Sequence, residues 1–237
     1  MRVQLLLSCI IKIMFEDIKN NIDFFIRSKT AFSRKNYEEK DENALNYNFL
    51  ENLYTFDVLS AYFNPSPRNC ASVLDIGCKN WSYVKGEYNF FKTFCSEFVL
   101  EGVEIDVHRL YKNFYSRYEY AKFYMKGLKN TNYIEGNLLD IERDYDFIIW
   151  FLPFVTQNPH IYWGLPKKFF MPEKLLQHAY SLLKKQGQLL IVNQGKDEAD
   201  IQKQMLDKLN IKYEEKGIVK SEFLQYKNDR YAFLIEK

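Results

Sequence analysis

The residues of this chain best suited to ligand chemistry lie in the run Ser72-Val-Leu-Asp-Ile-Gly-Cys-Lys-Asn-Trp81. Its apolar residues predict a buried strand that ends close to Asp75, and Gly77 permits a tight turn beside a ligand. A strand followed by a glycine turn and a helix presents free backbone N–H groups and a positive helix end to an anionic or polar ligand. A turn with one glycine is also common where nothing binds, so this segment alone supports both interpretations.

Acidic and polar residues also close the strands that are predicted further along the chain. Residues 98–106 are largely apolar and end in acids, of which Glu104 could accept hydrogen bonds from ribose hydroxyls. Glu104 lies 29 positions after Asp75, more than the roughly 20 of a compact dinucleotide unit, so we expect a long helix or loop over residues 81–97. Residues 133–140 predict a short strand and turn. Residues 145–155 predict a central strand that is covered on both faces.

The segments VLDIGC, LEGVEID, IEGNLLD, YDFIIWFLPF and LLKKQGQLLIV follow one another in the order and rough spacing of class I S-adenosylmethionine-dependent methyltransferases. The chain resembles that family over about residues 70–237. The resemblance implies an α/β, Rossmann-like fold with a seven-stranded, mostly parallel sheet, an antiparallel last strand and helices on both faces. It also implies S-adenosylmethionine as the cofactor. The residues that it assigns to cofactor binding are Asp75, Gly77 and Lys79 at the methionine part, Glu104 at the ribose and Asn137 at the adenine.

Three departures from the family pattern affect the transfer of these binding roles to this sequence. Only the first glycine of the usual G-x-G-x-G turn is present, and Lys79 and Trp81 stand at the other two positions. Asn137 stands where the family often has Asp, although its amide can still donate or accept a hydrogen bond. The motif of amine-methylating DNA enzymes reads Phe151-Leu-Pro-Phe154, which lacks the catalytic carboxamide or carboxylate. This absence argues against methylation of adenine N6.

The acceptor side is predicted at the end of the fourth strand and in the loop of residues 156–166. This loop carries His160, which is a candidate general base or else an ordinary surface histidine. The residues expected to line an acceptor pocket are Phe151, Pro153, Phe154 and Trp163. His108 and His178 are predicted to lie in helices and to be structural. No metal site is predicted, because no cysteine or histidine has the spacing of zinc ligands.

Composition limits the classes of partner. The net charge of +2 lacks the strongly basic character of most nucleic-acid-binding proteins, so nucleic acid is not an expected partner. Four cysteines without a C-x-x-C motif favour reduced thiols and a cytoplasmic protein, and Cys78 is expected to pack rather than react. The apolar run before Met14 is interrupted by Lys12 and is too short to span a bilayer. Either Met14 is the true start or the run is a packed extension.

The chain is expected to form an N-terminal helical extension over residues 1–69 and a methyltransferase-like domain over residues 70–237. The extension either covers the ligand or only caps the sheet. Further helices are predicted over residues 107–128, 172–185 and 197–209, and a hairpin with a short turn closes the sheet.

The resemblance predicts methyl transfer to an unidentified acceptor that is most simply a small molecule. Two alternatives remain: a non-catalytic protein that has lost the cofactor, suggested by Lys79 and Trp81, and an aminopropyl- or nucleotide-type transferase on the same fold. Residues 156–166 hold no acidic cluster of the kind that a polyamine-handling enzyme would need. The oligomeric state is not predicted.

Overall fold

The computed structural model describes residues 2–29 and 39–237, with side chains at 11–28 and 39–237. The chain forms two compact units, one of residues 1–33 and 154–172 and the other of residues 34–153 and 173–237. The predicted extension of residues 1–69 is divided between them. Its first helix lies in the first unit, and its second helix lies in the unit that holds the sheet.

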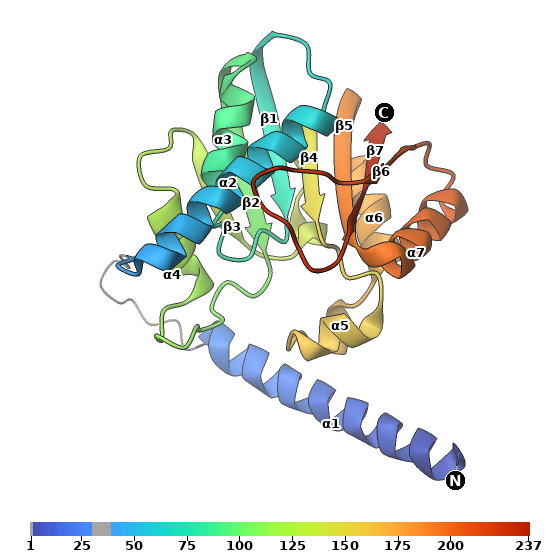
Figure 1. The fold of residues 1–237 in the computed structure, drawn as a ribbon. Helices are drawn as coiled ribbons and strands as arrows, with labels where there is room; N and C mark the ends of the chain where they lie inside the picture. The colour runs from blue at the N-terminus through green and yellow to red at the C-terminus, as the bar shows by residue number, and fades with distance from the viewer. Residues whose placement is uncertain (1, 30–38) are drawn as a thin grey trace. The chain divides into compact units, whose positions relative to one another are not determined.

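The second unit contains one seven-stranded sheet in the order β3-β2-β1-β4-β5-β7-β6 (Figure 1). The pairs from β3 to β5 are parallel, whereas β7 is antiparallel to both β5 and β6. The predicted sheet and its reversed last strand are therefore confirmed. The strands are β1 (Arg68–Ile76), β2 (Cys95–Glu104), β3 (Thr131–Glu135), β4 (Tyr145–Phe151), β5 (Leu183–Gln194), β6 (Glu214–Ile218) and β7 (Arg230–Glu236).

Helices cover both faces of this sheet, as predicted. Residues of α2, α3 and α4 pack on one face, and α6 and α7 lie on the other. The helices of this unit are α2 (Glu42–Tyr62), α3 (Val84–Lys92), α4 (Arg117–Tyr124), η1 (Leu138–Asp140), α6 (Pro172–Ser181) and α7 (Gly195–Lys208). Alternate strand residues face each side, so the very apolar β4 is buried on both faces, as its sequence predicts.

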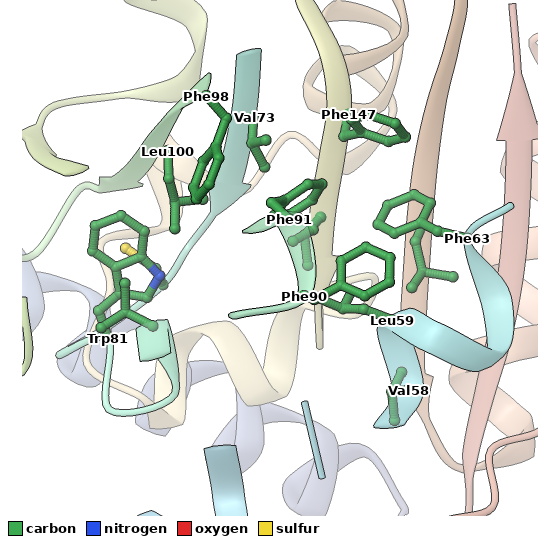
Figure 2. Packing of buried hydrophobic residues seen from close by; sticks show 14 of the residues in the cluster. Val58, Leu59, Phe63, Val73, Trp81, Phe90, Phe91, Phe98, Leu100 and Phe147 are labelled. Carbon is green, nitrogen blue, oxygen red and sulfur yellow. The ribbon is translucent and has the colours of Figure 1, made fainter. Parts of the chain in front are cut away.

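The core between the sheet and α2 and α3 is rich in phenylalanine (Figure 2). Phe91 of α3 lies 5.4 Å from Phe147 of β4, and Phe63, which ends α2, lies 5.3 Å from Phe147, both between ring centroids. Aromatic pairs at such distances add about 0.5–1.5 kcal/mol to the burial of their apolar area. This packing fixes α3 over β1 and β4, and thereby the turn that joins β1 to α3.

Polar side chains of α2 also hold the start of α3. Asn52 Oδ1 accepts a hydrogen bond from the backbone N–H of Gly86 at 2.7 Å, and Asn52 Nδ2–H donates to the Ser82 carbonyl oxygen at 3.0 Å. Asn48 donates to the same carbonyl, and the Ser82 hydroxyl donates to Glu51. A Cβ at Gly86 would collide with the backbone of Asn52, so glycine is what permits this close approach.

Several predicted boundaries were wrong. Residues 107–116 form an irregular segment, and only residues 117–124 of the predicted tyrosine-rich helix over 107–128 are helical, as α4. The helix starts late because Ser116 and Glu119 form a capping box at that point. The helix predicted to reach residue 185 ends at Ser181, and β5 begins at Leu183. Strands β6 and β7 are joined by residues 219–229 rather than by a short turn.

The first unit contains α1 (Arg2–Lys29), α5 (Gln157–Tyr162) and η2 (Lys167–Phe169). Helix α1 contacts α5 and η2 through both polar and aromatic side chains, with the rings of Phe24 and Phe169 5.0 Å apart. Asn20 Nδ2–H donates to the Ile161 carbonyl oxygen at 2.9 Å, and Asp17 Oδ1 accepts the Lys167 N–H at 2.5 Å. Among the described helices none is both long and apolar enough to cross a bilayer.

Candidate functional site

The turn after β1 has a backbone that is typical of glycine, although only its first key position is glycine. Gly77, Lys79 and Trp81 have φ angles of +70°, +55° and +51°, so every second residue is left-handed. Each of the two side-chain-bearing residues costs about 1–2 kcal/mol in this region. These are the three positions of the G-x-G-x-G pattern. The left-handed conformation is therefore present at all three positions, although two of them are not glycine.

Groups outside the turn hold the peptide units on either side of Lys79. Its N–H donates to Glu104 Oε2 at 3.0 Å, and the Tyr133 hydroxyl donates to its carbonyl oxygen. Trp81 is fully buried, and its Nε1–H donates to Glu87 Oε2 at 2.8 Å. Strained backbone of this kind persists only where the surroundings fix it. Here the fixing groups come from β2, β3 and α3.

A small residue on β2 makes room for the Trp81 ring. A Cβ at Gly102 would lie 2.9 Å from that ring and 2.8 Å from Sγ of Cys78. Cys78 is fully buried, and burial raises the pKa of its thiol well above the usual value. A thiol that stays protonated is a poor nucleophile, so the structure supports the packing role predicted for Cys78. By contrast, a Cβ at Gly77 would meet no atom within 4 Å, so the space beside this residue is open.

Glu104 at the end of β2 is buried and accepts three hydrogen bonds. Its Oε1 accepts the N–H of Asp106 at 2.8 Å and Nη1–H of Arg117 at 3.0 Å, and its Oε2 accepts the N–H of Lys79. Arg117 is the first residue of α4 and is itself buried, so the two charges form a buried ion pair. A carboxylate has about four acceptor positions. One position therefore remains for a hydroxyl of a ligand.

Asp75 and Glu87 form a pair of fully buried carboxyl groups beneath the turn. Neither oxygen of Asp75 meets a hydrogen-bond donor among the described residues. Its pKa is raised to about 7, mainly because burial removes the carboxylate from water, although Tyr83, Glu87 and Trp81 oppose the rise. Burial and the charge of Asp75 raise the pKa of Glu87 as well. Near neutral pH the pair therefore holds at least one proton.

Asn137 follows β3 and caps the short helix η1. Its Oδ1 accepts the backbone N–H of Leu139 at 3.0 Å. The amide nitrogen is the part of this side chain that a ligand would meet as a donor. Asp75, Gly77, Lys79, Glu104 and Asn137 all follow or end neighbouring parallel strands, so the sheet brings them to one edge.

The residues predicted to line an acceptor pocket are divided between the two units. Phe151 and Pro153 belong to the unit with the sheet, where Phe151 ends β4 and its ring lies 5.8 Å from that of Tyr83. Phe154 and Trp163 belong to the other unit, with ring centroids 6.3 Å apart.

His160 is buried, so the alternative prediction of an ordinary surface histidine was wrong. Its Nε2 lies 2.9 Å from the Pro166 carbonyl oxygen, and its ring contacts those of Phe154 and Phe170 at 5.5 and 5.4 Å. Burial lowers its pKa, which the bond to Pro166 partly opposes. A neutral imidazole N–H bonded to a backbone carbonyl fits a structural role within its unit.

The other two histidines have partners as well. His108 lies in a turn, not in the predicted helix, and its Nε2 is 2.8 Å from Glu135 Oε1. His178 lies in α6, as predicted, with Nε2 2.9 Å from the Ile141 carbonyl oxygen. Within the described part of the chain, no group of His, Cys, Asp or Glu side chains could hold a metal ion.

Sequence reasoning missed four residues that shape the site: Glu51, Glu87, Arg117 and Tyr133. Nothing in the pattern links Arg117 to Glu104, because the helix was expected to start earlier. The one signal was Trp81, since a buried indole N–H at a glycine position needs an acceptor, and Glu87 supplies it.

Comparison with known proteins gives matches in structure only. No family model matches the chain, and no curated protein does. Three solved structures illustrate the likeness. An S-adenosylmethionine-dependent methyltransferase from Aquifex aeolicus has a TM-score of 0.54 and 15% identity, covering 84% of this chain and 98% of its own. A methyltransferase from Pyrococcus furiosus has a TM-score of 0.52 and 16% identity, covering 92% and 95%. A cyclopropane-fatty-acyl-phospholipid synthase-like protein from Lactobacillus casei has a TM-score of 0.58 and 9% identity, covering 85% and 96%.

At sequence identities of 9–16%, the similarity to these three structures concerns the fold alone. The fold is the Rossmann-like fold of S-adenosylmethionine-dependent methyltransferases, as the sequence resemblance predicted.

Proposed function

We propose that this protein binds S-adenosylmethionine and transfers its methyl group to a small-molecule acceptor in the cytoplasm. The observation that carries the proposal is the turn at residues 77–81. It keeps a left-handed residue at each key position of the family's glycine turn, at a cost in strain, and it stands beside an acid that ends β2. Strained backbone of this kind gathers at ligand-binding sites, which supports a ligand for this turn.

The residues present fit such a cofactor. Open space beside Gly77 leaves room for the methionine part, and the one remaining acceptor position of Glu104 suits a ribose hydroxyl. The orphaned oxygens of Asp75 would accept hydrogen bonds from a cationic amino group, which would also favour the ionised form of that acid. The amide of Asn137 would meet the adenine.

The chemistry that the cofactor supplies when bound is an activated methyl group on a sulfonium. The protein then has to align the acceptor with that methyl group, and alignment alone can contribute about 7–11 kcal/mol. Phe151, at the end of β4, and the aromatic ring of Tyr83 beside it would exclude water from one side of the acceptor. A general base is needed only if the acceptor must lose a proton.

Calorimetric titration with S-adenosylmethionine and S-adenosylhomocysteine tests this function. We expect micromolar binding by the wild type and at least tenfold weaker binding by Glu104→Ala, because a hydrogen bond to a charged group contributes about 1.5–3 kcal/mol. Glu97→Ala is the matched control, since Glu97 is an exposed acid near the other end of β2. A folded wild type that binds neither ligand would contradict the proposal and leave a methyltransferase-like fold without its cofactor.

A further inference from the structure

Helix α1 turns most of its apolar residues away from the elements on which it packs. Within its own unit it contacts α5 and η2 through Asp17, Asn20 and Phe24, which follow one another at intervals of three and four residues. Asn20 is almost fully buried there, and its Nδ2–H donates to the carbonyl oxygens of Ile161 and Leu165. The contacts of α1 within its unit thus use one side of the helix.

The other side of α1 carries an apolar stripe of six large side chains that are 47–67% exposed. The stripe consists of Ile11, Met14, Phe15, Ile18, Ile22 and Phe25. A surface helix normally turns such residues towards the core. Each exposes about half of a side-chain surface of roughly 200 Å², so the six offer on the order of 600 Å². A contiguous patch of this size indicates an interaction surface.

The charges that border the stripe distinguish between the partners that its spacing allows. Intervals of three and four residues suit a second helix and a lipid surface alike. One edge of the stripe has a charged border whose signs alternate along the helix, made of Lys12, Glu16, Lys19 and Asp23. The other edge carries the uncharged Asn21 and Ser28. An anionic lipid surface favours cations alone, whereas an alternating border is complementary to another alternating border.

A single two-fold axis satisfies both the charged border and the stripe. In an antiparallel pair of identical helices, an axis perpendicular to the helices brings the same border of each copy together. With the axis at the midpoint of Glu16 and Lys19, Glu16 lies opposite Lys19 of the second copy. Lys12 and Asp23 are equally far from that midpoint, so they lie opposite each other as well. The stripe is centred on Ile18, within one residue of the same point.

We propose that two copies of this chain associate through α1 as an antiparallel pair, with the stripe at the centre of the interface and the charged borders as its flanking ion pairs. The stripe and border of each copy together approach the roughly 800 Å² that a standard interface takes from each partner. Asp17 and Asn20 remain bound to η2 and α5 on the other side of the helix. Dimerisation and the fold of the unit therefore use different sides of α1.

Analytical ultracentrifugation of the full chain, at micromolar concentrations up to about 100 µM, measures this association. We expect a particle of twice the chain mass of 28.5 kDa. Ile18→Glu should raise the dissociation constant of the dimer at least tenfold, because the axis brings the two new carboxylates together. Glutamate is a good helix former, so the far-UV circular dichroism should be unchanged. Ile218→Glu is the matched control, since Ile218 is an isoleucine of β6 with similar exposure, 45% against 54%.

Charge reversal tests the antiparallel arrangement. Glu16→Lys should raise the dissociation constant at least threefold, because it sets a lysine against Lys19 of the second copy. Adding Lys19→Glu restores opposite charges and should return the constant to within twofold of the wild type. In a parallel pair Glu16 would face the uncharged edge of Asn21 and Ser28, so neither variant would change the constant. That result would overturn the antiparallel arrangement.

The remaining outcomes either support or overturn the proposal, and none depends on cofactor binding. A wild type that stays monomeric at the highest concentration would overturn it, as would a dimer that Ile18→Glu leaves intact. Monomers that bind phosphatidylglycerol vesicles, and lose this binding in Ile18→Glu, would overturn it in favour of a lipid surface. A dimer that is weakened by Ile18→Glu and Glu16→Lys, unaffected by Ile218→Glu and restored by the double reversal would support it.

Discussion

The turn at residues 77–81 and the segment at residues 154–170 both carry predicted site residues, but their polar groups are bound in different ways. In the turn, backbone groups of strained residues are held by charged side chains, as where Glu104 accepts the Lys79 N–H. In the segment, the polar group of His160 is bound to a backbone carbonyl and enclosed by phenylalanine rings. The first arrangement uses charged side chains, and the second uses an imidazole ring and a backbone carbonyl.

The difference shows why a residue's type is weak evidence of its role. A histidine in a loop suggested catalysis, and a tryptophan in a glycine turn suggested a lost site. Burial and hydrogen-bond partners reverse both impressions, because His160 is buried and bound to a backbone carbonyl, while Trp81 packs beneath the turn and is bound to Glu87. Four changes would test or refine this contrast.

The largest effect is expected from the two tryptophans of these regions. Trp81→Ala should lower the free energy of unfolding by about 3–5 kcal/mol, because it removes a fully buried ring and leaves Glu87 without its donor. Trp163 is 45% exposed, so Trp163→Ala should cost about 1 kcal/mol. Urea unfolding of both variants measures the difference. Equal losses would mean that the turn is not the more tightly packed region.

The next effect concerns pH. Asp75 has a folded-state pKa of about 7, above its unfolded value, so it stabilises the fold at low pH and this stability is lost as the pH rises towards 7. Between about pH 5 and pH 7.5 the loss should be about 2 kcal/mol. Urea unfolding at the two pH values should show this decline in the wild type and a flatter profile in Asp75→Asn. A wild type whose stability rises over this range would contradict the assignment.

His160→Ala should cost about 2 kcal/mol, since it removes a buried hydrogen bond and two ring contacts. The loss should be local, so hydrogen exchange should quicken at the backbone amides of α5. Calorimetry should show unchanged affinity for S-adenosylhomocysteine. If exchange in α5 stays slow while methyl transfer falls, His160 acts in catalysis instead.

The smallest effect compares one substitution at two lysines. Lys79→Gly should raise the free energy of unfolding by up to about 1 kcal/mol, because it removes left-handed strain. Lys85→Gly, in the first turn of α3, should lower it by up to about 1 kcal/mol, because glycine is a poor helix former. Thermal unfolding of the two variants shows whether each substitution raises or lowers stability. A loss of stability at both positions would show that the Lys79 side chain contributes more by packing than it costs in backbone strain.

Much of the fold could be predicted from the sequence, because its strands coincide with runs of apolar residues. The apolar run of β4 predicted a central strand. The acidic and amide side chains that end or follow the strands were predicted to lie at one edge of the sheet. The start of α4 could not be read in the same way. Tyrosines recur through residues 107–128, but the capping box of Ser116 and Glu119 decides where the helix begins.

The partners within the site could not be predicted, because they depend on contacts between distant elements. Arg117 meets Glu104 only because α4 starts where it does, and Arg230 reaches the same edge only because β7 is reversed. Asp75 and Glu87 were separated by a turn of unknown conformation. The left-handed residues of that turn bring the two acids together beneath it.

The place of β7 between β5 and β6 has a consequence for how the molecule assembles. β6 precedes β7 in the chain but touches the sheet only through it. β6 therefore has no strand partner without β7, and β7 also covers the edge of β5. Pairing of β7 with both neighbours thus completes the sheet, so loss of β7 would expose the edge of β5 and leave β6 unpaired. Arg230 is the first residue of β7 and pairs with Gln194, so its place at this edge depends on the same pairing.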